Sequence, residues 1–429
     1  MKTALKKYIP QVIGLLLIVG IVITVYFAFF AEKPAVYIPD NNLIDTSYKD
    51  EEQKTSYIRS IPKQSQSSET FLYYQSITGD GNTFFKNIFK TASGNYIVCE
   101  SDCKNGDIQG EKRCVGIARL DDLANISQVY TIPSQQSSYY VNAQITPEGI
   151  VVITTNAAKE VYYVNIVSYE LDSVHTIIIQ YADECIIRPD SNSFIIISEF
   201  PDENYIYRYS DGKLAFTGIT AGNVVEVFEF SKHYTLFINT ANGYTIANVN
   251  KSTLNVTGET YINGYTLVSV NPIIEDGVQK FLTIETNGSA YARKMTRLDN
   301  SESSLVKLGT FSVKDVCRGD SLVLVCSGRH NGLVYLSYDL VCAYGESGTN
   351  YWVTSVVDSN YLNGTYYYLT LNAENELVLL TRKNDTTTSI KIAANCQGGS
   401  FIFNANNSIM IAYQTVVNNA KCIEIIGII

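Results

Sequence analysis

A short apolar strand recurs along most of this 429-residue chain. We find eight copies at spacings of 32 to 55 residues: YIVCES from Tyr96, IVVITT from Ile150, FIIISE from Phe194, YTLFIN from Tyr234, KFLTIE from Lys280, LVLVCS from Leu322, LVLLTR from Leu377 and IMIAYQ from Ile409. Several copies follow turn residues, and several precede a strand of alternating apolar and polar residues, such as YIYRYS from Tyr205. This pattern indicates units of three or four antiparallel strands.

The composition indicates that these units contain few helices. Hydrophobic residues make up 46% of the chain and charged residues only 17%, and 32 residues are tyrosine. Aromatic and β-branched residues pack well on the pleated, half-buried surface of a sheet. Apolar residues at the helical spacing i, i+3, i+4, i+7 are nearly absent after residue 31. We therefore predict an all-β domain.

The repeat resembles the β-propeller class in general, including WD40 and YVTN-like repeats. The resemblance covers Phe71 to Ile429 and implies a ring of blades that cover one another's apolar faces. It matches no family within the class, because the Trp-Asp and Gly-His pairs of WD40 blades are missing. We expect a single β-propeller of eight blades over residues 70–429. The final interval of 32 residues is short by one strand, so a seven-bladed ring with a reduced last unit is the alternative.

The chain also predicts how such a ring closes. The last repeat offers only three strands, within SFIFNA, SIMIAYQ and KCIEIIGI, whereas TFLYYQSI from Thr70 to Ile77 precedes the first repeat and has no partner within it. An open blade would leave a row of backbone groups unpaired. We expect Thr70 to Ile77 to complete the last blade as its outer strand.

The N-terminal segment predicts a membrane anchor. Lys2, Lys6 and Lys7 precede an uncharged apolar run from Val12 to Ala31, which is long enough to cross ~30 Å of hydrocarbon as a helix. The excess of lysine before the run orients residues 1–11 toward the cytoplasm. We predict a transmembrane signal-anchor helix at 12–31, a flexible polar spacer at 32–69 and an extracytoplasmic domain at 70–429.

A cleaved signal peptide is the competing interpretation of the same segment. Cleavage requires a shorter apolar core followed by small residues, whereas this run ends in Tyr26, Phe27, Phe29 and Phe30. We therefore favour a single-pass membrane protein. In both interpretations the large domain is extracytoplasmic.

Nine cysteines are compatible with a few disulfide bonds in an oxidising compartment. A hairpin centred on Ile108 and Gln109 would place Cys103 directly opposite Cys114, so these two form the one disulfide that we predict. Cys317 and Cys326 are also near one another in the chain. A turn at residues 318–321 would place Leu322 opposite Cys317, so we predict no bond between those two. Reduced, buried thiols are the alternative for all nine.

The chain carries few signs of catalysis. It has only three histidines, no nucleophile elbow, no paired Cys-x-x-Cys and no calcium loop. We therefore predict no catalytic, cofactor-binding or metal-binding residue, and no cofactor. A formal net charge of −10, with no basic cluster after residue 31, also argues against nucleic-acid binding.

These observations predict a binding or scaffold module at the cell surface, with an unknown protein or glycan ligand. Tyrosine clusters at 139–140, 162–163 and 366–368 could contact such a ligand, but within strands we expect them to pack between blades. The alternative is a membrane-tethered hydrolase or lyase that acts on envelope polysaccharide and needs two converging carboxylates. The candidates for that pair are Asp183, Glu184, Glu226, Glu285 and Asp315.

Overall fold

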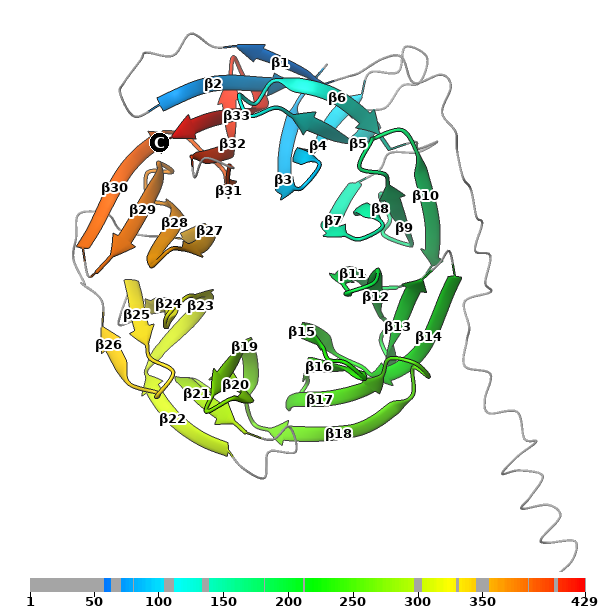
Figure 1. Ribbon diagram of the computed structural model, residues 1–429, viewed down its shortest axis with the longest axis vertical. Coiled ribbons are helices and arrows are strands. Elements are labelled where there is room, and N and C mark those ends of the chain that lie inside the picture. The colour runs from blue at the N-terminus through cyan, green and yellow to red at the C-terminus, as the bar shows by residue number, and fades with distance from the viewer. Residues whose placement is uncertain are drawn as a thin grey trace, which may run out of the picture. The chain divides into compact units, whose positions relative to one another are not determined.

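Eight antiparallel sheets form a ring around a central channel (Figure 1). This computed structural model describes residues 58–62, 71–79, 81–103, 112–132, 139–180, 182–210, 213–296, 303–328, 332–344, 355–384, 386–404 and 408–428. Within them the chain is an eight-bladed β-propeller, which confirms the predicted all-β class and excludes the seven-bladed alternative.

We number the blades in chain order, each from its innermost to its outermost strand. Blade 1 contains β3 (Thr83–Thr91), β4 (Gly94–Cys103), β5 (Lys112–Leu120) and β6 (Ile126–Thr131), and blade 2 contains β7 (Tyr139–Thr146), β8 (Gly149–Thr155), β9 (Val161–Val167) and β10 (Val174–Gln180). Blade 3 contains β11 (Glu184–Pro189), β12 (Phe194–Glu199), β13 (Glu203–Ser210) and β14 (Lys213–Thr220), and blade 4 contains β15 (Asn223–Glu229), β16 (His233–Thr240), β17 (Gly243–Asn250) and β18 (Val256–Asn263).

The second half of the ring repeats this order. Blade 5 contains β19 (Thr266–Glu275), β20 (Val278–Thr286), β21 (Ala290–Met295) and β22 (Ser303–Gly309), and blade 6 contains β23 (Phe311–Arg318), β24 (Leu322–Gly328), β25 (Gly332–Leu336) and β26 (Cys342–Tyr344). Blade 7 contains β27 (Ser355–Leu362), β28 (Thr365–Leu371), β29 (Leu377–Lys383) and β30 (Thr386–Ala393). Blade 8 combines β31 (Gly399–Phe403), β32 (Ile409–Val417) and β33 (Ala420–Ile428) with β2 (Phe71–Thr78) and β1 (Arg59–Pro62) from the N-terminal part of the chain.

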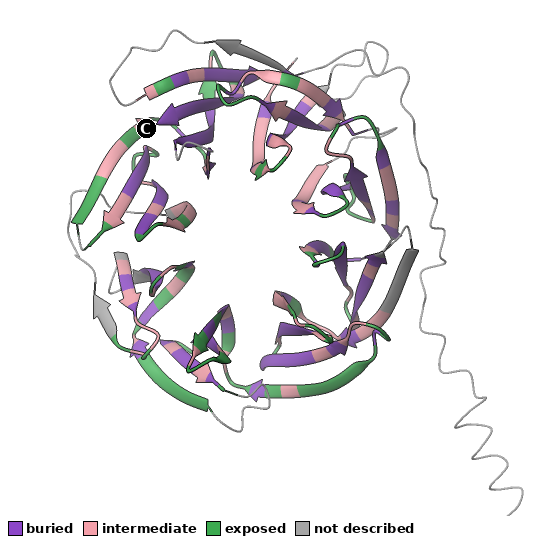
Figure 2. Ribbon diagram, viewed as in Figure 1, coloured by how far each residue is buried: buried purple, intermediate pink, exposed green. Residues whose placement is uncertain are grey.

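The recurring apolar segment is the second strand of a blade in seven of the eight blades. These strands are covered on both faces by neighbouring blades, which is why all seven residues of β8 are buried (Figure 2). In blade 7, however, the aligned segment LVLLTR forms β29, the third strand, and the second strand is TYYYLTL in β28. The short final interval therefore comes from aligning the wrong strand of blade 7, and blade 8 lacks no strand.

The innermost strands share a feature that the sequence analysis missed. Six of these eight strands, all within the described residues, contain a one-residue β-bulge, and the residue after each bulge is polar: Asn87, Asn142, Glu226, Ser269, Asp315 and Asp358. At four of these positions the side chain accepts a hydrogen bond from the next backbone N–H, with distances of 2.8 to 3.1 Å. A bulge interrupts the ladder and leaves backbone groups unpaired, and the polar side chain satisfies one of them.

Ring closure follows the prediction in that β2 completes blade 8, but β2 is not its outer strand, because β1 lies outside it. Strand β2 pairs with β33, and Ile77 lies opposite Ile423 in a core that both blades 8 and 1 contribute to. The Tyr74 hydroxyl donates a hydrogen bond to Glu424, a carboxylate that is 5% exposed and also accepts a bond of 2.8 Å from Tyr413. The strand from the N-terminal part of the chain is thus tied to the C-terminal strand by backbone, apolar and polar contacts.

The folded domain begins earlier than predicted. Strand β1 lies inside the stretch 32–69 that we expected to be a spacer, and it pairs with β2 as a fifth, edge strand that ends in Pro62. Ile58 is only 3% exposed. Gly116 makes room for it, since a Cβ atom there would lie 2.5 Å from Ile58 Cδ1.

The predicted anchor helix at 12–31 lies outside the described residues, as does everything before Ile58. Among the residues that are described, none belongs to a helix with the length and apolar character needed to cross a membrane.

Closure of blade 8 predicts a local difference in stability along β2. Ile77→Ala removes a fully buried side chain and should lower the free energy of unfolding by about 2–5 kcal/mol. Leu72→Ala on the same strand is the matched control, because Leu72 is 45% exposed, and its effect should stay below about 1 kcal/mol. Thermal and urea unfolding of the two variants measure this difference. Equal destabilisation by both changes would contradict the closure model.

Candidate functional site

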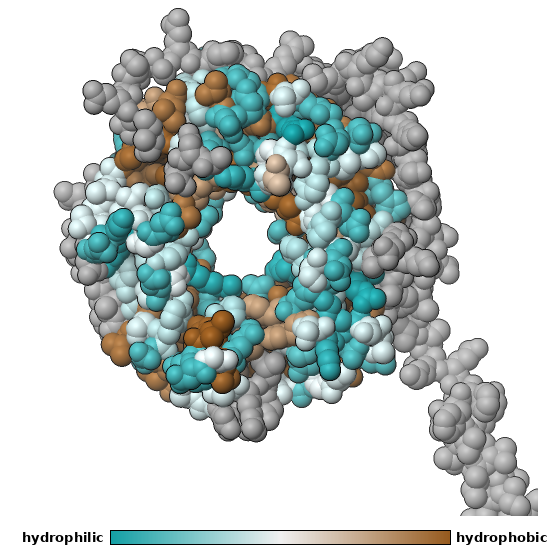
Figure 3. All heavy atoms as spheres, viewed as in Figure 1, coloured by the Kyte–Doolittle hydropathy of each residue, from teal (hydrophilic) through white to brown (hydrophobic). Residues whose placement is uncertain are grey.

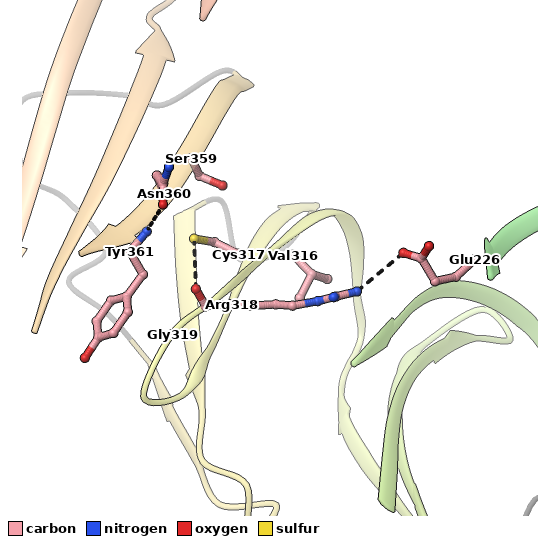
Figure 4. A pocket seen from close by; sticks show the side chains of 8 residues that line it. All are labelled: Glu226, Val316, Cys317, Arg318, Gly319, Ser359, Asn360 and Tyr361. Atoms are coloured by element: carbon pink, nitrogen blue, oxygen red, sulfur yellow. Dashed lines mark hydrogen bonds and ion pairs between the residues drawn. The ribbon is translucent and has the colours of Figure 1, made fainter. Parts of the chain in front are cut away.

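The central channel is open in the space-filling view, and the innermost strands form its wall (Figure 3). A pocket of about 570 Å³ lies in this wall, where β23 and β27 approach their ends. Its lining comes from β15, β23 and β27 and the turn after β23 (Figure 4): Glu226, Val316, Cys317, Arg318, Gly319, Ser359, Asn360 and Tyr361. We call it the Arg318 pocket.

Arg318 is held in place by blade 5. Its Nε donates a hydrogen bond of 2.7 Å to Asn271 Oδ1, and its Nη2 donates to the Val270 carbonyl oxygen. Nη2 also lies 3.5 Å from Glu226 Oε2, on blade 4. The side chain is still 46% exposed. A guanidinium that is fixed on one side and open on the other is prepared to bind an acceptor group.

Glu226 lies between two arginines. Besides Arg318, the Nε of Arg188 on blade 3 lies 3.7 Å from Glu226 Oε1. The same Oε1 accepts the Val227 backbone N–H at 3.1 Å, which orients the carboxylate after the bulge of β15. Glu226 therefore offers a fixed acceptor beside the fixed donors of Arg318.

The opposite wall of the pocket supplies an amide and a phenol. Asn360 Oδ1 accepts the Tyr361 backbone N–H at 2.8 Å, which leaves its Nδ2 as a donor without a partner among the described residues. A hydrogen bond to the Asp320 carboxylate raises the pKa of Tyr361 to about 12, so its hydroxyl stays protonated at neutral pH. The Tyr361 ring lies 4.7 Å from the ring of Tyr366, centre to centre.

The cysteine in the pocket is not an activated nucleophile. Cys317 is a free thiol and only 4% exposed, and burial raises its pKa. The thiol form is a poor nucleophile. Within the described part of the chain, no group of three or more His, Cys, Asp and Glu side chains is arranged to hold a metal ion. The pocket thus offers hydrogen-bond donors and acceptors in fixed positions.

The five carboxylates proposed from the sequence occupy different surroundings. Glu226 lines the pocket, Asp315 is exposed on β23, and Asp183 and Glu184 are exposed at the start of β11. Glu285 is fully buried inside blade 5.

Glu285 has a structural role. Its two carboxylate oxygens accept hydrogen bonds from Arg293 Nε at 2.8 Å and Nη2 at 3.1 Å, which makes a bidentate ion pair. Its Oε1 also accepts a hydrogen bond of 2.7 Å from the Tyr244 hydroxyl of blade 4. A buried carboxylate needs such partners to remain charged. Glu285 therefore joins blades 4 and 5.

The tyrosine clusters pack largely between blades, as expected. Tyr162, Tyr366 and Tyr368 are buried, and the hydroxyls of the first two donate to backbone carbonyl oxygens of the neighbouring blade, at 2.8 Å to Asp183 and 3.1 Å to Ser321. The remaining members, at 139, 140, 163 and 367, are partly buried.

The cysteine predictions are partly corrected. Cys114 is disulfide-bonded, but the side chain of Cys103 lies outside the described residues, so this pairing stays a prediction. The expected register was wrong by two residues, because Cys114 lies opposite Ser101 and Cys103 opposite Lys112.

Neither Cys317 nor Cys326 forms a disulfide bond, as predicted. Val323, not Leu322, lies opposite Cys317, because Arg318 still belongs to β23 and the turn is one residue shorter than expected. The reading of 318–321 as a turn is also why the sequence analysis overlooked Arg318. The bulge motif on the innermost strands is the signal that could have indicated which residues line the channel.

No known family model and no curated protein sequence matches this chain. Among solved structures, the chain is similar to the Dos1 propeller, at 10% identity over 81% of this chain and 96% of that one, with a TM-score of 0.48. It is also similar to the WD40 domain of SCAP from fission yeast, at 8% identity over 69% and 86% of the two chains, with a TM-score of 0.43. The propeller domain of the Trilobed protease from Pyrococcus furiosus matches at 11% identity over 67% and 94%, with a TM-score of 0.43. These likenesses concern the fold alone.

Buried thiols and phenols predict an alkaline limit to stability. Burial raises the pKa of Cys99 and Cys185 from 9.0 to about 12, and that of Tyr73 from 10.0 to about 12. Because these groups lose protons at lower pH in the unfolded chain than in the folded protein, their contribution to stability is complete below pH 9.0 and is lost as the pH rises toward about 12.

Thermal unfolding from pH 7 to 12 should therefore show a midpoint that falls above pH 9.0. A Cys99→Ala/Cys185→Ala variant is the control, and its midpoint should fall less steeply over the same range. A midpoint that declines equally in the variant would contradict the role assigned to the two thiols.

Proposed function

We propose that this protein is a binding or scaffold module whose ligand enters the Arg318 pocket in the channel. The observation that carries the proposal is the set of fixed polar groups there, namely Arg318, Glu226 and Asn360, each oriented by a bond to its own scaffold. Pockets with a few oriented polar groups bind small ligands or protruding parts of larger ones. Sites built this way need little reorganisation when the ligand arrives.

The pocket favours ligands that carry hydroxyl or amide groups. Arg318 and Asn360 supply donors, Glu226 supplies an acceptor, and the ring of Tyr361 supplies a flat apolar surface. A glycan, or a polar loop of a protein, presents both donors and acceptors close to apolar faces. A net charge of −10 disfavours nucleic acid as a partner.

We further propose that the propeller is held outside the cytoplasm by the apolar run at 12–31. The three lysines before the run and the absence of charge within it support this topology. The protein would then display its channel at the cell surface.

A hydrolase or lyase is less well supported. Asp315 and Asp358 lie on neighbouring innermost strands, and burial raises the pKa of Asp358, with the charge of Asp315 adding to the effect. Asp358, however, accepts hydrogen bonds from the backbone N–H groups of Ser359 and Phe401 and from the Ser400 hydroxyl. Oδ2 accepts both bonds from blade 8 and Oδ1 accepts the bond from Ser359, so Asp358 is placed to join blades and not to protonate a substrate.

Binding assays on the full-length protein in detergent test the pocket. The probes are an array of neutral oligosaccharides and an array of polar peptides. Arg318→Ala and Asn360→Ala should each weaken the binding of a positive probe by roughly tenfold or more, the scale of one hydrogen bond to a charged group. Lys391→Ala, a 57%-exposed lysine paired with Glu376 on blade 7, is the control and should bind like the wild type. Unchanged binding by both pocket variants would contradict the proposal.

Protease treatment of intact cells tests the topology. Cleavage after the anchor should release a fragment that contains the whole propeller, because the only expected membrane segment is at 12–31. Lysed cells serve as the control for total cleavage. A propeller that is protected in intact cells would overturn the orientation, and a mature N-terminus near Glu32 would indicate a cleaved signal peptide.

A further inference from the structure

Three cations surround one aromatic ring on blades 1 and 8. The ring belongs to Phe84 on β3, and its centre lies 4.6 Å from Arg113 Cζ, 5.0 Å from Lys421 Nζ and 5.8 Å from Lys86 Nζ. Arg113 comes from β5 and Lys421 from β33, so the C-terminal strand of the chain contributes to the group. None of these residues lines the Arg318 pocket. We call them the Phe84 cluster.

Two of the cations are fixed by one buried carboxylate. Glu100 is 2% exposed, and its two oxygens lie 2.9 Å from Lys86 Nζ and 2.7 Å from Arg113 Nη1. The side chains of Lys86 and Arg113 remain 24% and 33% exposed. Charge-assisted bonds to one buried carboxylate hold both cationic groups in place, while part of each side chain stays accessible to solvent.

The third cation is positioned through its backbone. Lys421 donates its backbone N–H to Asn82 Oδ1 at 3.1 Å, and Asn82 Nδ2 donates to Asp102 Oδ2 at 2.8 Å. Asp102 Oδ1 in turn lies 3.6 Å from Arg113 Nε. This chain of contacts holds the start of β33 against blade 1.

The cluster carries more positive than negative charge. In the part of the chain that the structure describes, the carboxylates that pair with Lys86 and Arg113 are Glu100 and Asp102, in a protein whose net charge is −10. Among the described residues, the Lys421 ammonium contacts the Phe84 ring and no carboxylate. An exposed contact between a cation and a ring contributes only about 0.5–1 kcal/mol, and an ammonium carries three N–H donors, so Lys421 can bind an acceptor group in addition to the ring.

We propose that the Phe84 cluster binds a single oxyanion group, a carboxylate or a sulfate, with Lys421 as its principal donor. Tyr139 and Tyr140 extend the site with flat apolar faces, since their ring centres lie 5.5 Å from Arg113 Cζ and 5.5 Å from Lys86 Nζ. A sugar that carries one acidic group fits this combination of cation and ring. An extended polyanion fits less well, because the protein as a whole carries a net charge of −10.

Thermal shift and titration calorimetry on the full-length protein in detergent test the site at constant ionic strength. The probes are sodium sulfate and sodium glucuronate, with sodium chloride and glucose as the matched controls. We expect saturable stabilisation by at least one of the two anions, and by neither control. The anion that binds more tightly identifies the source of the oxyanion. Shifts that match those of chloride, or binding of heparin without either small anion, would overturn the proposal.

Variants locate the binding at Lys421. Lys421→Gln should weaken binding of the positive anion by about tenfold, and Lys421→Arg should retain it, because the charge is kept. Lys391→Gln removes an exposed positive charge from blade 7 and should have no effect. If only Lys421→Gln weakens binding, the loss of charge is the cause; if both variants bind weakly, the substitution has disturbed the fold. Wild-type affinity in Lys421→Gln would overturn the assignment.

Discussion

The pairing of β2 with β33 is the contact on which the rest of the structure depends. The apolar second strands of the blades have two faces to bury, and only neighbouring blades can cover both. A ring supplies a neighbour for every blade, provided that the last blade is completed and docked on the first. Here β2 completes the last blade, and Ile77 joins the core between blades 8 and 1. The Tyr74 hydroxyl also donates a hydrogen bond to Glu424. The channel, the Arg318 pocket and the Phe84 cluster all require this closure.

Once the ring is closed, polar side chains join neighbouring blades near the channel. Gln414 of blade 8 accepts the Phe85 backbone N–H of blade 1 at 2.7 Å, and Glu199 of blade 3 accepts that of Val224 on blade 4 at 2.8 Å. Asp358 crosses to blade 8 in the same way. These bonds satisfy backbone groups at the channel wall that would otherwise face a partly buried surface. The wall is consequently polar and pre-oriented.

This arrangement supports the proposed binding role of the channel. A side chain that bridges two blades has few free positions, so a ligand meets donors and acceptors that are already ordered. Bonds to neighbouring groups of the protein also hold the acidic side chains near the channel and between the blades. Glu285 pairs with Arg293, Glu226 lies between two arginines, and Asp358 accepts three hydrogen bonds. Glu285 and Asp358 are therefore committed to the scaffold, whereas Glu226 is held beside the partly exposed Arg318 in the proposed ligand site.

Local sequence determined much of the fold. The apolar second strands, the turns before them and the unpartnered strand at 70–77 were sufficient to predict an all-β propeller, eight blades and the closing strand, because each reflects a local rule of burial or pairing. The N-terminal run likewise predicts an anchor from its length and charge alone. Other features arise only when distant strands meet. Arg318 became a pocket residue because Asn271 and Glu226 come from two other blades, and Lys421 reached Phe84 because the C-terminal strand packs on the first blade. The sequence also did not predict the pairing register at Cys103 or the place of the Leu377 strand within its blade. Both depend on the partner strands that a segment packs against, and no single segment encodes those partners.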